Sequence, residues 1–416
     1  MESALDAALR DLWQHLTSDR QSWLLGAGVS FMAGIPLMVP LTTHVVDRVA
    51  ADSPEQAELL TAIRDQLPQD CHVEHMLSQI GDFIALADRS RAGSVQMTGK
   101  DVAADALRDL HTRILEAIGN AVRYGYRPPR NGQPEVRGTA SQPIISVDDH
   151  RSFVRHLFAA REKPGFQQVP ITFFTTNYDT LIEDALALQQ VPFADGFLGG
   201  AMGFWAPDVG FTETRSNRAA ARVVKLHGSV DWHRSEDGSV IRCRNGCAYP
   251  SRDGNLLIYP QSTKYVATQK DPFAALFSLF RQTLSVGPDN VLGICGYSFG
   301  DDHIDGEIEA VMSHQSSKTV IVAFAQEVLD PLGEPQLPTR VREWLTARPW
   351  RDRVFVASSK GLYHGSMTNL CDTAKDMDWW TFQGLTNFLS EGPEYLPAAA
   401  PGPIPSPEVT LTEAAE

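Results

Sequence analysis

The sequence predicts an α/β fold: a parallel sheet with helices on both faces and an inserted helical module. Several short apolar runs lack polar alternation and are bounded by turn residues, which is typical of buried parallel strands. Helical patterns separate most of these runs, as expected for strands joined by crossover helices. A long stretch after the first run is dominated by helical periodicity. The expected strands are Ser22–Leu25, Ile171–Thr175, Arg222–Leu226, Leu256–Tyr259, Val291–Cys295, Thr319–Phe324 and Val354–Ala357.

The order of these patterns along the chain predicts its organisation. The helical stretch contains HVVDRVAADS, EQAELLTAIRDQL, VEHMLSQIGDFIALADRS, DVAADALRDLHTRILEAIGNAVRYG and DDHRSFVRHLFAAR, with a loop at Arg127–Val147 that is rich in Pro, Gly and Asn. An amphipathic helix is expected around Trp379–Leu389, and the composition of the last residues is that of a disordered tail. We therefore expect a sheet domain that begins in 1–40 and resumes in 166–365, a helical module at 41–165, a C-terminal helix at 366–395 and a tail at 396–416.

Composition narrows the function classes. The 416 residues are 43% hydrophobic, and 36 basic against 51 acidic residues give a net charge of −15. An acidic balance works against non-specific nucleic-acid binding, which needs a basic surface. No apolar run approaches the roughly 20 residues that span a bilayer, and the N-terminus is an amphipathic pattern without a secretion signal. Five cysteines are few and odd in number, so we expect a reduced, cytoplasmic protein.

The first motif is Gly26-Ala27-Gly28-Val29-Ser30, followed by Gly34-Ile35-Pro36. Glycines at a strand-to-helix turn let the backbone approach a pyrophosphate, whose charge then lies at a helix N-terminus. Position 31 is Phe, so the three-glycine dinucleotide fingerprint is incomplete. The glycines could equally serve only to form a tight turn.

Three further motifs follow expected strands. Thr175-Thr176-Asn177-Tyr178-Asp179 places polar groups at a strand end, where open α/β sheets bind ligands, although Asn177 or Asp179 could simply cap the next helix. In Lys225-Leu226-His227-Gly228-Ser229, the histidine is either a general base or a structural residue. Gly296-Tyr297-Ser298-Phe299-Gly300 is a small-residue turn that could receive phosphate or ribose oxygens.

The order GAGVS with GIP, then TTNYD, then LHGS, then GYS resembles the sirtuin superfamily, which has a Rossmann-like fold. More narrowly, it resembles the bacterial sirtuin-like NAD hydrolases of anti-phage defence. The matching motifs span roughly residues 22–300, and the helical module between the first two motifs also suits that group. The resemblance implies an NAD glycohydrolase that cleaves the nicotinamide–ribose bond, and thereby depletes host NAD in abortive infection.

The resemblance also implies roles for individual residues. Asn177 would contact the ribose that is opened, and His227 would act as the base. The residues implied to bind the rest of NAD are Ala27, Gly28 and Ser30 around the pyrophosphate and nicotinamide ribose, Ile35, Pro36 and Asp179 towards nicotinamide, and Gly296 and Ser298 on the adenosine side. Gly26 and Thr176 are also expected to contribute to NAD binding.

Departures from protein-deacylating sirtuins favour water as the acceptor. Those enzymes follow GIP with Asp-Phe-Arg, where this chain has Leu-Met-Val, and carry Gln where this chain has Thr176. They also bind structural zinc through two cysteine pairs, whereas here only Cys243 and Cys247 follow the HGS motif. His233 could add a third ligand, but an incomplete set favours a simple hairpin, so we expect no metal and no cofactor beyond NAD as the substrate.

Two other functions compete with this hypothesis. Gly296 to Gly300 matches the G-x-S-x-G pattern of serine hydrolases, with Ser298 as the nucleophile and His364 downstream, but no oxyanion segment precedes it. Alternatively, the protein senses NAD or ADP-ribose without cleaving it. The acids at 301, 302 and 305 read as a helix start, so no nuclease metal cluster is expected.

Regulation is expected to come from assembly. Only about 60 residues follow the last expected strand, too few for an ordinary sensor domain. By family analogy we expect a homo-oligomer controlled by a separate HerA-type hexameric ATPase, with an Argonaute-like protein as the second candidate. The Trp379-Trp380 segment and the N-terminal helix are candidate contact surfaces, or else packed core.

Overall fold

The computed structural model describes residues 4–97, 99–130, 132–162, 169–211, 219–235, 237–244, 255–258, 272–285, 290–330, 333–371 and 376–395. Of the strand expected at Leu256–Tyr259, Tyr259 lies outside these ranges. Of the cysteines Cys243 and Cys247, Cys247 lies outside them. The tail expected at 396–416 lies outside them entirely.

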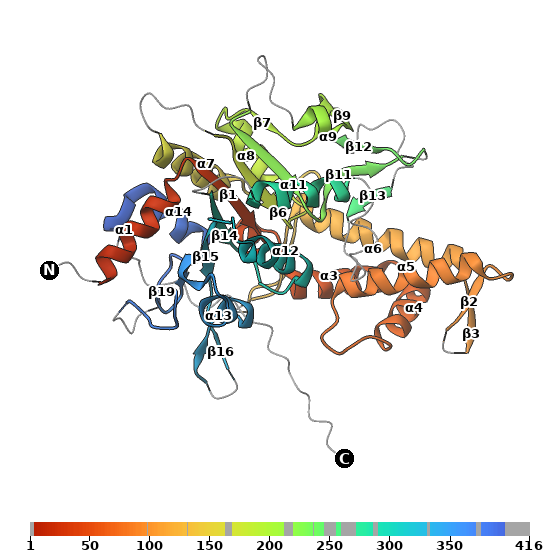
Figure 1. Ribbon diagram of the computed structural model, residues 1–416. Helices are drawn as coiled ribbons and strands as arrows, with labels where there is room; N and C mark the ends of the chain where they lie inside the picture. Colours follow the sequence, from red (N-terminus) through yellow and green to blue (C-terminus); the bar gives the residue numbers. More distant parts are fainter. Residues whose placement is uncertain are drawn as a thin grey trace.

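The centre of the molecule is a mostly parallel sheet (Figure 1). In the described chain its order is β19-β18-β15-β14-β1-β6-β10-β7, and only β19 runs antiparallel to its neighbour. When the strands of the spatial order β10-β6-β1-β14-β15-β18 are numbered by their sequence along the chain, the order becomes 3-2-1-4-5-6, which is that of the Rossmann fold. The strands are β1 Arg20–Leu25, β6 Ile171–Thr175, β7 Phe193–Ala194, β10 Ala221–Lys225, β14 Asn290–Cys295, β15 Val320–Ala325, β18 Val354–Ser358 and β19 Leu362–His364.

Helices cover both faces of this sheet because both faces of its strands are apolar. Along β1, for example, Trp23 and Leu25 belong to one core cluster and Leu24 to the other, as the alternation of side chains across a strand requires. The first face is covered by α1 Ala4–Leu16, α7 Asp148–Arg161, α8 Leu181–Leu188 and α14 Phe382–Glu391, and the second by α11 Phe273–Ser285, α12 Asp302–Ser313 and α13 Thr339–Thr346. The predicted α/β fold with a parallel sheet is confirmed.

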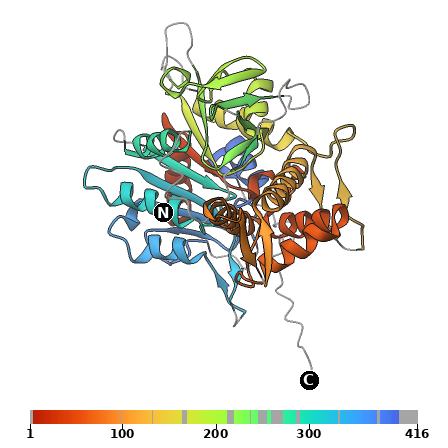
Figure 2. The ribbon, with the colours of Figure 1, turned by 90° about the vertical axis from the view of Figure 1, so that its right-hand side faces the viewer.

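A helical module leaves the sheet after β1 and forms a core of its own. It comprises α3 Met38–Asp52, α4 Pro54–Arg64, α5 Val73–Arg89 and α6 Ala104–Tyr124, with a hairpin of β2 Ser94–Met97 and β3 Lys100–Ala103 and a small pair of β4 Tyr126–Arg127 and β5 Val136–Arg137. The hairpin is a feature that helical periodicity did not reveal. Figures 1 and 2 show these orange helices projecting from the sheet.

Helix α7 lies within the range 41–165 expected for the module, but it packs with the sheet. Phe153 on α7 contacts Trp23 of β1 at 5.3 Å and Phe382 of α14 at 4.8 Å between ring centroids. The apolar side of α7 therefore covers the central sheet, and the module's own core is built by α3 to α6.

A second sheet is antiparallel, and one expected strand belongs to it. The segment around Leu256 was predicted as a buried parallel strand, which is wrong: β13 pairs antiparallel with β11. A short apolar run cannot reveal by itself which neighbour it will pair with. In the described residues this sheet has the order β13-β11-β12-β9-β8, with β8 Phe197–Gly199, β9 Met202–Trp205, β11 Gly228–Arg234, β12 Val240–Cys243 and β13 Asn255–Ile258. In Figures 1 and 2 it lies above the module.

The C-terminal segment packs onto the N-terminal helix. Helix α14 begins after Thr381, whose hydroxyl accepts from the amide of Gly384, so both tryptophans precede the helix. Trp379 and Trp380 are buried in the first core cluster, and Trp13 of α1 packs edge-on against Phe388. The tryptophan pair is thus packed core and offers no exposed contact surface. The remaining short elements are α2 Gly28–Phe31, α9 Pro207–Gly210, β16 Val328–Leu329, β17 Pro335–Gln336, and the 3-10 turns Arg351–Arg353 and Gly392–Glu394.

Within the described residues, no helix combines the length and apolarity that crossing a membrane would require.

Candidate functional site

The four sequence motifs meet at the carboxyl ends of β14, β1, β6 and β10, which are neighbours in the sheet. In a doubly wound sheet, ligands bind outside these ends, at the point where the strand order reverses. Here that point lies between β1 and β14, whose following turns carry the GAGVS and GYS motifs. The fold thus places the motifs where a ligand site is expected.

Gly26 and Gly28 bring two backbone turns into direct contact. A Cβ on Gly26 would lie 2.4 Å from the carbonyl oxygen of Gly296, and one on Gly28 would lie 2.8 Å from the Cα of Gly296. Their amides donate to the carbonyls of Cys295 at 3.0 Å and Gly296 at 2.8 Å. Gly296 itself has φ +66, a conformation that favours glycine. These glycines therefore do more than form a turn: they join the loop after β1 to the loop after β14.

The residue between these glycines is the accessible part of this motif. Ala27 is exposed at the start of the short helix α2, and Gly28 is half-buried beside it. Ile35 and Pro36, further along the same loop, are both buried, and Ile35 belongs to the core of the helical module. The GIP segment thus links the site loop to the module.

Asn177 and Asp179 connect the end of β6 to the end of β1. The side-chain amide of Asn177 donates to the carbonyl of Gly26 and to the hydroxyl of Ser30, each at 3.0 Å. The Ser30 hydroxyl in turn donates to Oδ2 of Asp179 at 2.8 Å. All three side chains are buried, and Ser30 is 1% exposed. Three residues named separately by the sequence motifs thus form one hydrogen-bonded triplet with Ser30 at its centre, an arrangement that the sequence did not predict.

Part of the capping interpretation is also correct. Oδ1 of Asp179 accepts from the amide of Leu181, the first residue of α8, at 3.0 Å. Asp179 thus holds the helix start with one oxygen and Ser30 with the other. Thr176 lies beside Asn177, half-buried, with its amide donating to the carbonyl of Leu25 at 3.1 Å.

His227 lies directly beyond β10 and faces an acid from another strand loop. Its Nε2 lies 3.0 Å from Oδ2 of Asp301, and the two side chains are 11% and 10% exposed. Asp301 caps α12, since its Oδ1 accepts from the amides of His303 and Ile304 at 3.1 and 3.5 Å. The predicted helix start is thus correct, but sequence reasoning missed the contact of the same carboxylate with His227. No local sequence motif could have revealed this contact, because His227 and Asp301 are 74 positions apart in the sequence.

The turn after β14 is anchored on one side and open on the other. Tyr297 is buried, and its hydroxyl donates to Oδ1 of Asp305 at 3.0 Å. Ser298 is exposed, so it is free of the packing that holds its neighbours and lies open to a ligand.

The structure does not bring Ser298 and His364 together. Their strands, β14 and β19, are separated by β15 and β18, which at about 4.8 Å per neighbour puts them about 14 Å apart. His364 stacks on Phe355 at 3.9 Å between ring centroids, and its Nε2 lies 3.0 Å from the carbonyl oxygen of Asp352. The arrangement of a serine hydrolase is therefore not formed by this pair.

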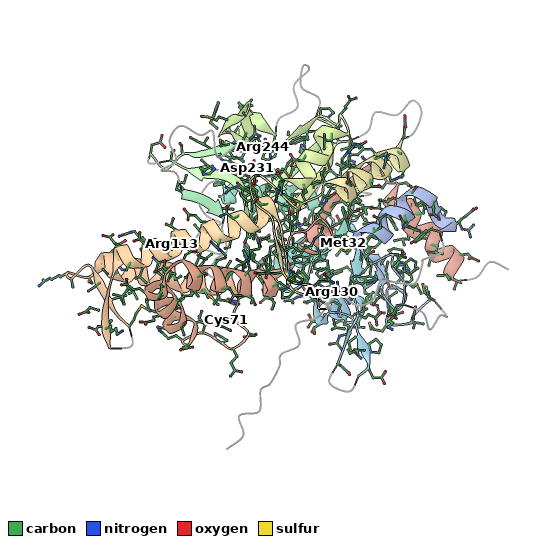
Figure 3. The ribbon with its side chains drawn as sticks, turned by 180° about the vertical axis from the view of Figure 1, so that it is seen from behind. Met32, Cys71, Arg113, Arg130, Asp231 and Arg244 are labelled. Atoms are coloured by element: carbon green, nitrogen blue, oxygen red, sulfur yellow. The ribbon has the colours of Figure 1, made fainter. Side chains whose placement is uncertain are left out.

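A buried charge network borders the site, and sequence reasoning did not anticipate it. Lys225, at the end of β10, is 2% exposed; its Nζ donates to the carbonyl of Asp179 and lies 3.5 Å from Oε1 of Glu183. Nη1 of Arg244 lies 4.0 Å from Oε1 of Glu183 and 3.0 Å from Oδ2 of Asp231, so it extends the network to Asp231. Arg244 and Asp231 are labelled next to each other in Figure 3. Burial raises the pKa of Glu183 to about 7. The network ties the antiparallel sheet to α8 and to the base of the site.

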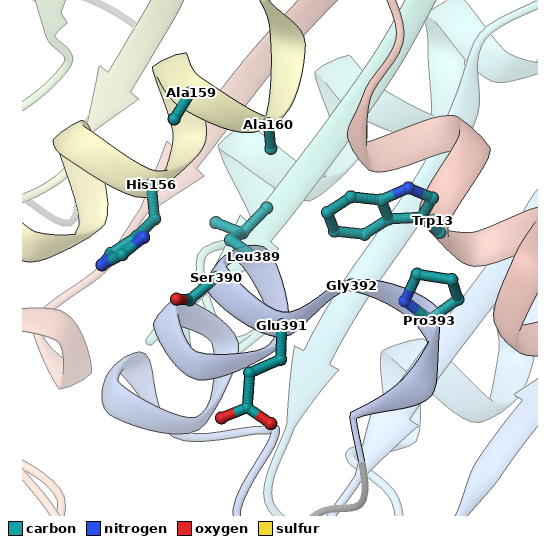
Figure 4. Close-up of a pocket in the computed structure, with 9 residues that line it drawn as sticks. All are labelled: Trp13, His156, Ala159, Ala160, Leu389, Ser390, Glu391, Gly392 and Pro393. Carbon is teal, nitrogen blue, oxygen red and sulfur yellow. The ribbon is translucent and has the colours of Figure 1, made fainter.

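A hollow of about 340 Å³ lies elsewhere, between α1, α7 and the end of α14 (Figure 4). Trp13, His156 and Leu389 are among its lining residues. None of the four site motifs lines this hollow, which lies among the helices that cover the first face of the central sheet. Among the described residues, no group of three His, Cys, Asp or Glu side chains is arranged to hold a metal ion.

Residues 171–345 match the family model of the SIR2-like domain. The match runs from β6 to α13 and therefore includes Asn177, His227 and the turn at Gly296. A search of curated proteins gave no match. Together with the Rossmann-like strand order, the match supports a sirtuin-like domain over these residues, and such a domain suggests an activity related to NAD.

Proposed function

We propose that the protein is an NAD glycohydrolase, which cleaves NAD with water into nicotinamide and ADP-ribose. The observation that carries the proposal is that Asn177 contacts Ser30 and His227 contacts Asp301, so both residues are tied to the loops after β1 and β14 that flank the switch point of the sheet. The alternative of a serine hydrolase lacks its histidine, as described above.

The residues suggest how the bond is cleaved. NAD would lie across the loops after β1 and β14, with its pyrophosphate near Ala27 and Gly28 and its adenosine side near Gly296 and Ser298. Nicotinamide departs with the electrons of the C–N bond, leaving an oxocarbenium-like ribose that fixed polar groups nearby can stabilise.

His227 would act as the general base. Water attacks the ribosyl carbon, and His227 accepts the proton that this water loses. Asp301, 3.0 Å from its Nε2, would hold the ring in place and stabilise the imidazolium that forms. Asn177 would orient the ribose, and Asp179 would face the nicotinamide carboxamide.

The test is chromatographic quantification of nicotinamide and ADP-ribose after incubation of NAD with wild type and Asn177→Ala. The expected result is release of both products in equal amounts by wild type and a loss of at least about 100-fold in the variant. His364→Ala serves as the control for the serine-hydrolase alternative, because this residue lies away from the proposed site. A wild type that binds NAD without cleaving it would instead favour a sensor of NAD or ADP-ribose.

We further propose that this activity depletes host NAD during phage infection and is controlled by self-assembly with a separate partner. The family resemblance favours a HerA-type hexameric ATPase, and an Argonaute-like protein is the second candidate. Expression of the chain alone, followed by measurement of cellular NAD, tests this control. Depletion of NAD without phage or partner would contradict it.

A further inference from the structure

Tyr178 stands between the two site residues Asn177 and Asp179 and points away from them, into the helical module. It is 9% exposed. Its hydroxyl donates to Oε1 of Glu74, on the first turn of α5, at 2.7 Å. Burial, with the Glu74 carboxylate as a second cause, raises the pKa of Tyr178 well above its ordinary value, so the hydroxyl remains a donor at neutral pH.

The backbone of Tyr178 reaches the segment that carries His227. Its carbonyl oxygen accepts from the amide of Val230 at 2.9 Å and from the hydroxyl of Ser229 at 3.3 Å. Val230 is three residues beyond His227 and lies on β11. One residue thus connects the loop after β6 to the loop after β10.

A second helix of the module, α6, also contacts the segment around Val230. Arg123, in the last turn of α6, donates to the carbonyl of Val230. Tyr178, Leu181 and Val230 also belong to the apolar cluster of the module rather than to either core of the sheet. The module therefore contacts both catalytic loops, by hydrogen bonds and by packing.

We propose that Tyr178 is a positioning residue, through which Glu74 and the helical module hold Asn177, Asp179 and His227 in their working arrangement. The proposal rests on the proposed NAD hydrolase function. A shift of α5 relative to the sheet would move the carbonyl of Tyr178, and with it the segment at 229–230, so the module sets the activity of the site. Partners that bind the module would act on catalysis by this route.

The test compares Tyr178→Phe with Tyr363→Phe. Tyr363 is also buried, at 7% exposed, and its hydroxyl also donates to a glutamate, Oε1 of Glu327 at 3.1 Å, but it lies on the edge strand β19. Both variants lose one tyrosine–carboxylate hydrogen bond, so they should lose similar thermal stability. Tyr178→Phe is expected to lower kcat for nicotinamide release at least 10-fold with KM changed less than 3-fold. Tyr363→Phe is expected to keep both within 2-fold.

A double variant tests the route through Glu74. If Tyr178 acts with Glu74, Glu74→Ala lowers kcat as Tyr178→Phe does, and the combination is no worse than either alone. Independent, multiplying losses would contradict the proposed pairing.

Hydrogen–deuterium exchange gives a readout that does not depend on activity. Amides at 175–180 and 227–231 are expected to exchange faster in Tyr178→Phe than in wild type, and unchanged in Tyr363→Phe. A wild type that releases no nicotinamide would overturn the proposed function, while the exchange result would still decide the positioning role. Equal exchange and equal kcat in the two tyrosine variants would overturn the inference.

Discussion

The contact between the loops after β1 and β14 predicts a strong effect of a single methyl group. In Gly26→Ala, the new Cβ would lie 2.4 Å from the carbonyl oxygen of Gly296, where ordinary contacts begin at 3.4 Å. The loops must then separate by about 1 Å, which strains two backbone hydrogen bonds made by Gly26 and Gly28. Overpacking costs about 1–3 kcal/mol, and each weakened hydrogen bond adds about 0.5–1.5 kcal/mol.

We therefore expect Gly26→Ala to lose about 3 kcal/mol of stability, combining overpacking and weakened hydrogen bonds. At about 2.1 cal/mol/K of unfolding entropy per residue, this corresponds to a fall in Tm of about 3–4 °C for a chain of 416 residues. The matched control is Gly306→Ala, in the exposed part of α12, where an added Cβ has no neighbour within 4 Å. That substitution should raise Tm by about 1 °C, because alanine favours the helix by roughly 1 kcal/mol. Thermal unfolding followed by circular dichroism measures both. A Gly26→Ala variant with a wild-type Tm, beside a stabilised control, would refute the packing account.

Two further predictions concern buried ionisable groups. Lys225→Met removes the nearer of the two cations beside Glu183 and leaves only Arg244, at 4.0 Å. The loss should cost about 3–5 kcal/mol in the free energy of unfolding, and adding Glu183→Gln should restore a large part of it. Equal losses in the single and double variants, measured by urea unfolding, would argue against the pair. Burial lowers the pKa of His150 in the folded protein to about 4, against 6.5 in the unfolded chain. Between these pH values the unfolded chain binds a proton that the folded protein does not, so the free energy of unfolding falls as the pH falls from about 6.5 to about 4. The total loss is about 3 kcal/mol. The stability difference between wild type and His150→Asn should therefore shrink between pH 7 and 4.5, and a difference independent of pH would contradict this.

The central strands could be predicted because burial on both faces leaves a simple mark in the sequence. Ile171–Thr175 consists only of β-branched and aromatic residues, which favour strands, and β6 has these same bounds. The run around Leu256 carries the same mark but pairs in the antiparallel sheet. Pairing partners are chosen by tertiary contacts, which a local pattern does not contain.

The site could be predicted as a set of loops but not as a set of contacts. Asn177 and His227 each follow a strand, so their place at the sheet edge was readable. Their partners Ser30 and Asp301 lie 147 and 74 positions away, and only the fold brings them close. Asp301 shows the limit well: its helix-capping role is local and was foreseen, whereas its contact with His227 is not local.

The buried charges were unforeseeable for a related reason. Lys225 ends an apolar strand and would ordinarily be expected to reach solvent, since buried lysines are rare unless paired. Its partner Glu183 lies on the helix that covers the neighbouring strand. Only the fold, which brings α8 to the end of β10, puts the two charges together.

The measurement that tests the central claim most directly is the rate of nicotinamide release by His227→Ala beside His364→Ala, with NAD binding measured on the same samples. Both variants lose a histidine, but only the first loses one at the switch point of the sheet. We predict that both bind NAD, that His364→Ala keeps the wild-type rate, and that His227→Ala is slower by about 100-fold or more. Equal rates in the two variants would contradict the assignment of the catalytic site to the ends of β1, β6, β10 and β14.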